Sequence, residues 1–409
     1  MAPEENAPQK EDKKKVEKKE KRTKEKMGKK FLILLIIGLV GLVSGAICLC
    51  VALFVIKNPA SEIFSFGDKK EDKEVVYSDL TGEPLADASM KNSLAYCIQV
   101  PNGTDGARPQ AGLTEAGVVF EAVAEAGITR FAAIFQNPKS AIIGPLRSLR
   151  IYYLEWDSPF DCAIVHAGGP GDAIAAVNAG GYKDLSESYS YMYRGTYSVR
   201  RWNNLFTTST YLKNFGTDYG YNQSNINGFK RMTPEESIKE RADSSAGALD
   251  ITSASSSNTS ETSAEVASIN LNFGGWPNFN VHYDYNSATN TYDRSYQGGV
   301  AHEVYKCADG NLGEKNPEDT CTLTQLSPAV VVAMIVKESR AADNYHEAIT
   351  TVGVGDAYIF QNGTVIKGSW SKATVRDQIK FFNEEGEEVS LAPGQTFVSA
   401  IPNYGSVEY

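Results

Sequence analysis

The stretch GVVFEAVAEAGITRFAAIFQ, residues 117–136, holds two apolar runs rich in β-branched and aromatic residues around a turn-like Glu125-Ala126-Gly127. Residues of these types favour strands, and glycine suits a chain reversal. The stretch therefore predicts two strands joined by a turn. A further strand is expected upstream, in the apolar run Leu94–Val100.

The segment that follows predicts a helix, then a strand that leads into a glycine-rich loop. Gly144-Pro145 precedes LRSLRIYYLEW, and proline is well tolerated in the first turn of a helix. The short apolar run Cys162–Val165 precedes HAGGPGD, residues 166–172, and the small residues AIAAVNA. We expect a buried strand, a glycine-rich loop and a short helix in this order.

The second half of the chain carries signals of β-structure. Phe279–Tyr285 alternates apolar and polar residues, which is typical of a half-buried strand. Ala329–Val336 is continuously apolar, as a central strand is. Asn362-Gly363 lies between two strand-like runs and is the strongest short signal for a hairpin.

Near its start the chain has a lysine-rich tail and then an unbroken apolar run of 26 residues, 31–56. As a helix this run is about 39 Å long, more than the roughly 30 Å hydrocarbon core of a bilayer. Residues 1–30 carry 12 Lys/Arg and 7 Asp/Glu, and basic flanks stay cytoplasmic. We expect an uncleaved single-pass transmembrane helix, with everything after Lys57 outside the cell. A cleaved signal peptide is the alternative.

Changes in composition divide the chain into segments. The stretch SSAGALDITSASSSNTSETSAE is too polar to pack and separates two domains that we expect to fold independently. The segments are a cytoplasmic tail (1–30), a transmembrane helix (31–56), a stalk (57–76), an N-terminal domain (77–243), a Ser/Thr-rich linker (244–266) and a C-terminal β-rich domain (267–409).

The charge and the cysteines limit the classes of function. Outside the tail the chain carries 28 Lys/Arg and 43 Asp/Glu, a net charge of −15, which argues against binding nucleic acid or anionic polymers by charge alone. Cys307 and Cys321 flank one polar loop and are candidates for a disulfide. Cys97 and Cys162 lie in apolar runs, where a disulfide and two buried thiols are both compatible with the sequence.

Several long motifs resemble the YerB-like family of exported bacterial proteins. They are ARPQAGLTEAGVVFEAVAEAGITRFAAIFQ with the following IGPLRSLR and FDCAIVHAGGP, and, further on, GVGDAYIFQNGTVIKGSWSK and LAPGQTFVSAIP. The resemblance implies an α+β (mixed α/β) first domain and a smaller β-rich second domain, with no assigned biochemical function. The chain departs from the family at Trp202-Asn203-Asn204, where Pro-His-Asn is usual, and many members are lipoproteins.

The HAGGPGD loop is the first candidate site. The N–H groups of a glycine-rich strand-to-helix turn, together with the positive end of a helix, favour phosphate or carboxylate. Arg147 and Arg150, three apart on the expected helix, can add donors, and His166 can donate or titrate. The alternative is a tight turn whose nearby arginines pair with carboxylates. The ligand-binding candidates are Arg147, Arg150, His166, Gly168, Gly169, Gly171 and Asn204.

Glu121 and Glu125 are the second candidate. In an extended strand both point to one face, and two carboxylates in a cleft can serve a glycosidase. The alternative is a salt bridge with Arg130 or with the two arginines above. With His166, these two residues are the weak catalytic candidates.

Neither a metal nor a cofactor is expected, although residues of metal-binding types occur in the second half. No tight motif joins them. The SxxK match at Ser369–Lys372 has no KTG partner and follows a hairpin strand, so we interpret it as chance. The residues of metal-binding types are His282, Asp284, Asp293, His302 and Glu303.

The sequence thus favours a membrane-anchored extracytoplasmic protein that is not an enzyme and binds a polar or anionic envelope ligand, such as a cell-wall fragment, or a protein partner. The alternative is a hydrolase or transferase acting on the cell wall, with Glu121, Glu125 and His166 as acid and base groups.

Overall fold

The computed structural model describes residues 75–196, 202–250, 266–310 and 313–409. Residues 75–409 form one compact unit. The expected tail and transmembrane helix, and the stalk as far as residue 74, lie outside the described residues. Within the described part of the chain, no helix is long and apolar enough to cross a membrane.

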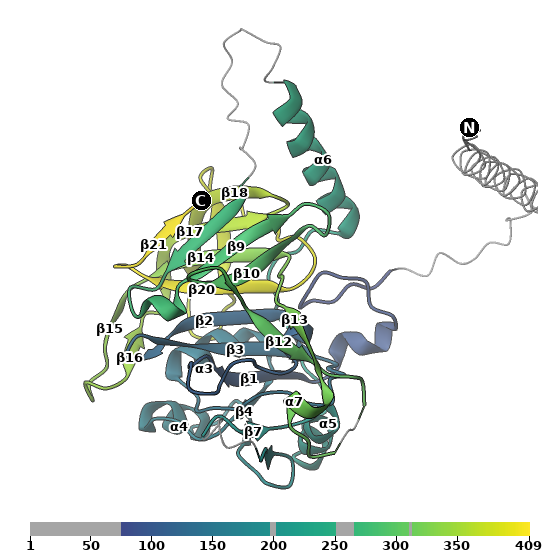
Figure 1. The fold of residues 1–409 in the computed structure, drawn as a ribbon, viewed down its shortest axis with the longest axis vertical. Helices are drawn as coiled ribbons and strands as arrows, with labels where there is room; N and C mark the ends of the chain where they lie inside the picture. Colours follow the sequence, from purple (N-terminus) through teal and green to yellow (C-terminus); the bar gives the residue numbers. More distant parts are fainter. Residues whose placement is uncertain (1–74, 197–201, 251–265, 311–312) are drawn as a thin grey trace, which may run out of the picture. The chain divides into compact units, whose positions relative to one another are not determined.

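The largest element of the fold is a mixed ten-stranded sheet built from both halves of the chain. Its strands are β1 (Ala95–Pro101), β2 (Val118–Glu125), β3 (Ile128–Gln136), β4 (Ala163–His166), β5 (Lys183–Ser186), β14 (Val330–Val336), β17 (Gly353–Gln361), β18 (Thr364–Lys372), β19 (Lys380–Asn383) and β20 (Thr396–Pro402). Their order is β19-β18-β17-β14-β20-β2-β3-β1-β4-β5 (Figure 1). Near the end of the chain, β20 pairs in parallel with β14 on one side and β2 on the other.

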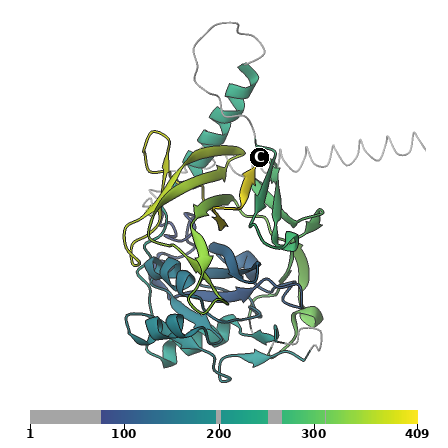
Figure 2. The same ribbon diagram turned by 90° about the vertical axis from the view of Figure 1, so that its left-hand side faces the viewer.

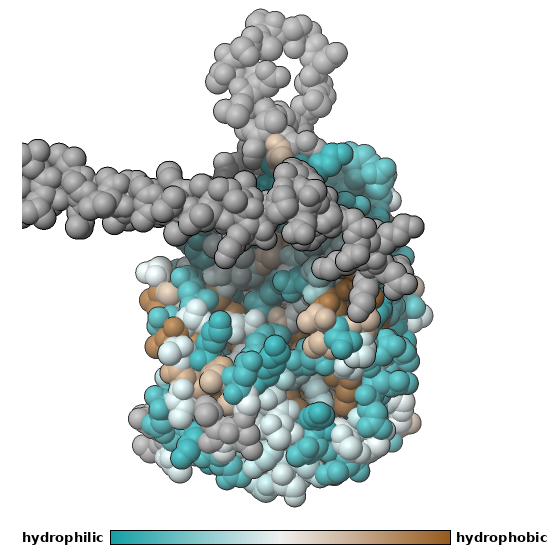
Figure 3. All heavy atoms as spheres, turned by 90° about the vertical axis from the view of Figure 1, so that its right-hand side faces the viewer, coloured by the Kyte–Doolittle hydropathy of each residue, from teal (hydrophilic) through white to brown (hydrophobic). Residues whose placement is uncertain are grey.

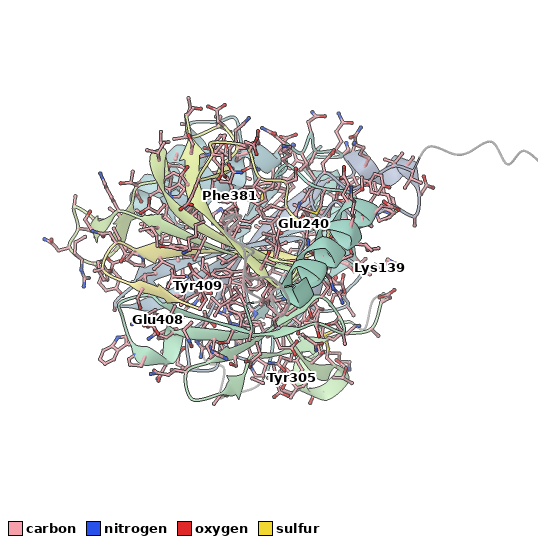
Figure 4. All side chains as sticks on the ribbon, turned by 90° about the horizontal axis from the view of Figure 1, so that it is seen from above. Lys139, Glu240, Tyr305, Phe381, Glu408 and Tyr409 are labelled. Carbon is pink, nitrogen blue, oxygen red and sulfur yellow. A yellow bond between two sulfur atoms is a disulfide. The ribbon has the colours of Figure 1, made fainter. Side chains whose placement is uncertain are left out.

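A second sheet contains five strands in the order β11-β10-β9-β8-β21. Its strands are β8 (Ser268–Asn272), β9 (Val281–Asn286), β10 (Thr291–Tyr296), β11 (Val300–Ala301) and β21 (Ser406–Glu408). In Figure 4, Glu408 and Tyr409 mark the end of the chain, where the Tyr409 ring packs 5.4 Å from that of Phe360. In the part of the chain that the structure describes, the remaining strands form three two-stranded ribbons: β6 (Tyr193–Arg194) with β7 (Leu205–Phe206), β12 (Glu303–Lys306) with β13 (Thr322–Gln325), and β15 (Glu338–Arg340) with β16 (Glu347–Ile349).

Among the described residues, all helices but one are short. The α-helices are α3 (Ile151–Asp157), α4 (Gly171–Asn178), α5 (Ser209–Asp218), α6 (Pro234–Asp250) and α7 (Pro317–Thr320), and 3-10 turns occur at η1 (Ala88–Asn92), η2 (Leu113–Glu115), η3 (Ser158–Phe160) and η5 (Pro277–Phe279). The long helix α6 is held to the turn between β17 and β18 by a hydrogen bond from Ser237 to Asn362 (2.9 Å). Figure 4 labels Glu240 on the same helix.

The apolar core crosses the boundary between the two halves. One buried cluster joins Phe120 and Trp156 of the first half to Val332 and Val398 of the second. Another lies between the large sheet and the five-stranded sheet and includes Val123 with residues of β8, β9 and β14. The halves therefore share both a sheet and a core, and neither buries its apolar surface alone. This differs from the expectation of two independently folded domains.

The strands predicted around residues 117–136 are confirmed. Strands β2 and β3 pair antiparallel around Ala126 and Gly127, which both adopt positive φ. The predicted strands at Leu94–Val100, Cys162–Val165, Phe279–Tyr285 and Ala329–Val336 and the hairpin at Asn362-Gly363 also form, as β1, β4, β9, β14 and the β17–β18 pair.

The helix expected from Pro145 begins later, at Ile151. In residues 145–150 the backbone N–H groups donate to other segments: Leu146 to Leu205, Arg147 to Gln99 and Leu149 to Gly168. Those N–H groups cannot also make helical hydrogen bonds, because each has one hydrogen to donate. Arg150 is the extended residue immediately before the helix.

Two further features differ from, or add to, the expectations. Helix α6 continues to Asp250 and so covers the first residues of the expected linker, while residues 251–265 lie outside the described ones. The structure contains disulfides Cys307–Cys321 and Cys97–Cys162. The Cys97–Cys162 disulfide links β1 to the residue before β4, and β1 and β4 are neighbouring strands of the large sheet.

Candidate functional site

Glu121 lies in a buried polar network rather than in a cleft. Its carboxylate accepts from Arg294 Nη2 (2.7 Å), Thr129 Oγ1 (2.9 Å) and Asn102 Nδ2 (3.3 Å), and both Glu121 and Arg294 are fully buried. Burial acts most strongly and lowers the pKa of Arg294, but the Glu121 carboxylate together with the Tyr283 and Tyr296 hydroxyl groups outweighs burial, and the pKa is raised. Glu121 is therefore a structural ion-pair partner with no path to a substrate.

The same network contains His302, a residue of the second half. Burial and the nearby arginines hold the pKa of His302 well below its ordinary value, so the ring is neutral. Its Nδ1 accepts from Arg294, and its Nε2–H donates to Gln110 Oε1 (3.1 Å). This arrangement fixes the ring between the two halves.

A β-bulge separates Glu125 from Glu121. The register of β2 and β3 shifts between Val123 and Glu125, and a bulge re-aims the side chains that follow it. Glu125 consequently leaves the face of Glu121 and meets Arg130 (Nη2–Oε1 2.8 Å) and Arg150 (Nη2–Oε2 2.5 Å). Burial acts to raise the pKa of Glu125, but these two arginines lower it. The expectation that Glu121 and Glu125 point to one face is therefore wrong. Glu125 instead forms salt bridges with arginines, which was the alternative expectation.

The buried His166 side chain forms a hydrogen bond to the backbone of the glycine-rich loop. It is buried at the end of β4, with Nδ1 2.8 Å from the Gly168 carbonyl oxygen and Nε2 3.0 Å from Asp184 Oδ1. Both partners are oxygen acceptors, so a ring nitrogen that carries a hydrogen donates it to one of them. His166 thus orders the loop through its own hydrogen bonds.

The two arginines expected to serve this loop diverge. Arg147 runs beside it, since its carbonyl accepts from Ala167 N (3.0 Å), but its Nε donates to Asn203 (3.1 Å). Arg150 turns to Glu125. An extended backbone points residues three apart in opposite directions, whereas a helix would have aligned them.

The remaining candidates have structural surroundings. Gly168 has φ of +69°, which suits a tight turn, and a Cβ on Gly169 would lie 3.2 Å from the Leu149 carbonyl oxygen. Gly171 begins α4 and has open space around it. Asn204 accepts from Arg194 Nη1 (3.0 Å) and donates to the Gly195 carbonyl (3.1 Å). The structure thus places the candidates in separate local groups, and anion binding at the loop stays a prediction.

A cleft of about 540 Å³ opens elsewhere, where four segments distant in sequence meet. They are the β2–β3 turn, the loop after β8, the β15–β16 ribbon and the turn after β20. On the left of Figure 1, β15 and β16 lie beside β2, and Figure 2 faces that side. The lining residues define the Trp276 cleft: Val123, Ala126, Gly127, Phe273, Gly274, Gly275, Trp276, Glu338, Ser339, Arg340, Glu347 and Tyr404.

Two adjacent glycines let the walls of the Trp276 cleft approach each other. A Cβ on Gly274 would lie 2.3 Å from the Tyr404 ring, so this ring rests directly on the Gly274 backbone. A Cβ on Gly275 would lie 2.9 Å from Cα of Gly127, so two backbones touch there. Distances this short exclude any side chain.

The cleft exposes two aromatic rings. Trp276 is 60% exposed and Tyr404 is 58% exposed, although each is packed on one side. The indole Nε1 of Trp276 donates to the Ala126 carbonyl oxygen (2.8 Å), which fixes the orientation of the ring. An exposed ring with a fixed orientation is a preorganised surface for another ring-shaped group.

The acidic rim of the cleft comes from the β15–β16 ribbon. Arg340 pairs with Glu347 in register, and their side chains form an ion pair of 3.6 Å. Glu338 instead accepts from the Tyr404 hydroxyl at Oε1 (2.6 Å), while its buried Oε2 has no hydrogen-bond partner among the described residues. Burial raises the pKa of Glu338 to about 7; the Tyr404 hydrogen bond opposes this rise and the Glu347 charge adds to it.

The metal and nucleophile motifs read from the sequence have ordinary structural places. The described ranges contain no group of three or more His, Cys, Asp or Glu side chains that could hold a metal ion. His282 pairs with Asp284 (3.0 Å). Ser369–Lys372 lie on strand β18 rather than on the helix that SxxK chemistry needs, and burial lowers the pKa of Lys372 to about 8.

Sequence reasoning missed the Trp276 cleft because its walls are far apart along the chain. The local signal is Phe273-Gly274-Gly275-Trp276-Pro277, where two glycines precede an exposed tryptophan. Glu338 and Glu347 carry no motif, since their pairing depends on the ribbon.

The fold and the cleft define a mixed α/β protein with a β-rich second part and one aromatic, acidic cleft. The sequence matches both models of a family described as protein of unknown function (DUF3048): the N-terminal domain over residues 80–222 and the C-terminal domain over residues 269–398. The chain belongs to this two-domain, YerB-like family.

Two relatives are consistent with this family and fold. The Bacillus subtilis protein named "Putative lipoprotein YerB" is 25% identical over 310 residues, which is 74% of this chain and 80% of that protein. The crystal structure of YerB from the same organism has a TM-score of 0.63 at 22% identity and covers 82% of this chain and all of that one. The structural likeness shows the fold alone.

Proposed function

We propose that this chain is an extracytoplasmic protein of the cell envelope that binds a carbohydrate in the Trp276 cleft. The observation that carries the proposal is the fixed, exposed Trp276 indole beside the hydrogen-bonding groups of Tyr404 and the β15–β16 ribbon. Pockets that bind small molecules combine apolar or aromatic walls with a few oriented polar groups.

The location rests on two supports. A relative that bears the name lipoprotein suggests a place in the cell envelope. The basic tail and the apolar run 31–56 favour attachment to the lipid bilayer with the N-terminus in the cytoplasm. Cleavage of that run, or its replacement by lipid, would leave the same part of the chain outside the cell.

The chemistry of the cleft favours a neutral sugar over the anion expected from the sequence. The apolar face of a pyranose ring can lie on the indole, while carboxylates, a guanidinium and a phenol supply acceptors and donors for hydroxyl groups. The Arg340 guanidinium is already paired with Glu347, and Glu338, whose pKa is about 7, adds only negative charge, so the cleft offers no net positive charge to an anion. A cell-wall polysaccharide made of N-acetylated amino sugars meets these requirements.

Titration of the purified full chain with tetra-N-acetylchitotetraose tests the proposal. We expect saturable quenching of tryptophan fluorescence and a matching heat of binding in calorimetry. Trp276→Ala should weaken binding at least tenfold, which is about 1.4 kcal/mol.

A matched control is available because Trp202 is equally exposed, at 61%, and is not a lining residue of the cleft. Trp202→Ala should leave the affinity unchanged. Equal losses in the two variants, or no saturable binding by the unaltered chain, would contradict the proposal.

A further inference from the structure

A third exposed aromatic ring, that of Tyr345, lies beside the Trp276 cleft. Tyr345 is 63% exposed and belongs to the tip that joins β15 to β16. The next residue, His346, forms an antiparallel bridge with Glu125 at the end of β2. In an antiparallel bridge, the residue before one partner comes close to the residue after the other, so Tyr345 is brought near Ala126. The Ala126 carbonyl oxygen also accepts from the Trp276 indole (2.8 Å), so both rings are attached to one wall of the cleft.

The tip holds Tyr345 in a defined position. The Asp343 carboxylate accepts from the backbone N–H groups of Tyr345 (2.9 Å) and His346 (3.0 Å), and its other oxygen lies 2.6 Å from Nδ1 of His346. The Tyr345 ring packs edge-on against the His346 ring, with their centroids 4.9 Å apart. A side chain that is ordered before a ligand arrives loses less conformational entropy on binding.

Tyr404, Trp276 and Tyr345 follow the β15–β16 ribbon. The Tyr404 hydroxyl donates to Glu338, the first residue of β15, at 2.6 Å. The ribbon stays hydrogen-bonded as far as Ala341, three residues further on, which is about 10 Å at the rise of an antiparallel strand. Tyr345 lies beyond that point, at the tip. The three rings therefore extend over a length that a single six-membered ring does not span.

Exposed aromatic rings are concentrated at this ribbon. The described residues contain seven exposed aromatic side chains, and three of them are Trp276, Tyr345 and Tyr404. The ribbon lies on the face that Figure 2 turns toward the viewer, whereas Figure 3 shows the opposite face, where apolar side chains are interspersed with polar ones. A group of exposed apolar side chains on a soluble protein often marks a binding surface.

We propose that Tyr345 is a second sugar-binding platform, and that the ligand of the Trp276 cleft is a polysaccharide chain whose rings lie along Tyr404, Trp276 and Tyr345. The inference rests on the proposed function, since it needs a sugar to lie on Trp276. Once one ring of the chain is bound, a linked ring meets the next platform at a high effective concentration. Affinity should therefore rise with the length of the chain.

Titration of the purified full chain with N-acetylglucosamine oligomers of two, four and six rings tests the inference, by tryptophan fluorescence and calorimetry. We expect the hexamer to bind at least about tenfold more tightly than the dimer. Tyr345→Ala should weaken hexamer binding at least about fivefold and leave dimer binding unchanged, because a dimer needs only the cleft. Trp276→Ala should weaken the binding of both. Tyr345→Phe should keep the affinity for the hexamer, because the ring face forms the platform.

Tyr219 supplies a matched control. It is exposed, and its ring packs edge-on against Phe215 as the Tyr345 ring packs against His346. It follows α5 and is not a lining residue of the cleft. Tyr219→Ala should bind the hexamer as the unaltered chain does.

Three results would overturn the inference and leave the proposed function standing. They are equal affinities for the dimer and the hexamer, equal losses in Tyr345→Ala and Tyr219→Ala, and a loss in Tyr345→Phe as large as that in Tyr345→Ala. Absence of binding to every oligomer would overturn both the inference and the proposed function.

Discussion

Glu121 and Arg294, 173 residues apart in the sequence, form an ion pair of 2.7 Å in which both side chains are fully buried. Strand β2 carries the glutamate and strand β10 the arginine, so the pair joins the two halves of the chain. Arg294 also donates to the Tyr283 hydroxyl (3.1 Å) and to His302. Glu121 and Arg294 can therefore pair only when the two halves of the chain are packed together.

Removal of one partner of this ion pair should destabilise the protein strongly. Arg294→Met leaves Glu121 as a buried charge without a counterion, and such changes cost about 3 to 5 kcal/mol. The double variant Glu121→Leu/Arg294→Met should cost less than the sum of the single changes, measured by urea denaturation. Lys380→Met, which breaks the exposed pair with Glu388, is the control and should cost less than about 1 kcal/mol. Additive losses at the buried pair would contradict this account.

The two halves should not fold separately. Strand β20 of the second half pairs with β2 of the first, so each fragment alone exposes a sheet edge and an apolar face. Fragments 77–243 and 267–409 should each lack a cooperative thermal transition, and co-expression should restore one. Protease cleavage within 251–265 should leave the two pieces associated in size-exclusion chromatography. A cooperative transition in either isolated fragment would refute this.

Gly275→Ala should open the Trp276 cleft and lower stability. The new Cβ meets the Gly127 backbone at 2.9 Å, and neither backbone can yield without separating two loops. We expect a loss of about 1 to 3 kcal/mol and weaker binding of the tetrasaccharide. The matched control is Gly171→Ala, because its Cβ meets nothing within 4 Å and its φ is negative. Equal melting temperatures of the two variants would show that the glycine contact is unimportant.

Glu338 should make stability depend on pH. Burial raises its pKa from 4.5 to about 7, so between these values the folded state holds a proton that the unfolded state releases. Its contribution is therefore full below about pH 4.5 and is lost as the pH rises through about 7. Relative to the unaltered chain, Glu338→Gln should gain about 1 to 2 kcal/mol between pH 5 and pH 8, allowing for solvent screening. Parallel curves of unfolding free energy against pH would exclude this shift.

The two disulfides should stabilise unequally. Cys97–Cys162 spans 65 residues and Cys307–Cys321 spans 14, and closing a longer loop removes more entropy from the unfolded chain. Loss of the first bond, in Cys97→Ala/Cys162→Ala, should cost about 4 kcal/mol, and loss of the second about 3 kcal/mol. Thermal melts with and without reductant measure both. A reversed order would mean that loop closure does not control the difference.

Local patterns in the sequence predicted most of the strands. The turn at Ala126-Gly127, the hairpin at Asn362-Gly363 and the apolar run at Ala329–Val336 depend on neighbouring residues, so their positions could be read directly. The helix start at Pro145 could not, because the N–H groups of residues 146, 147 and 149 are taken by segments elsewhere in the chain. The same holds for Glu125, whose direction is set by a bulge.

The sequence by itself determined the secondary structure of the hairpins and the family, because turn chemistry, apolar periodicity and long motifs are properties of contiguous residues. Only the tertiary structure decided which charged groups meet. Glu121 pairs with Arg294 and not with an arginine nearer in the sequence. The cleft likewise brings together residues from three separate segments, namely Trp276, the pair Glu338 and Glu347, and Tyr404. Pairing of charges and closure of a cleft depend on distances across the fold, and residue spacing along the chain does not encode those distances.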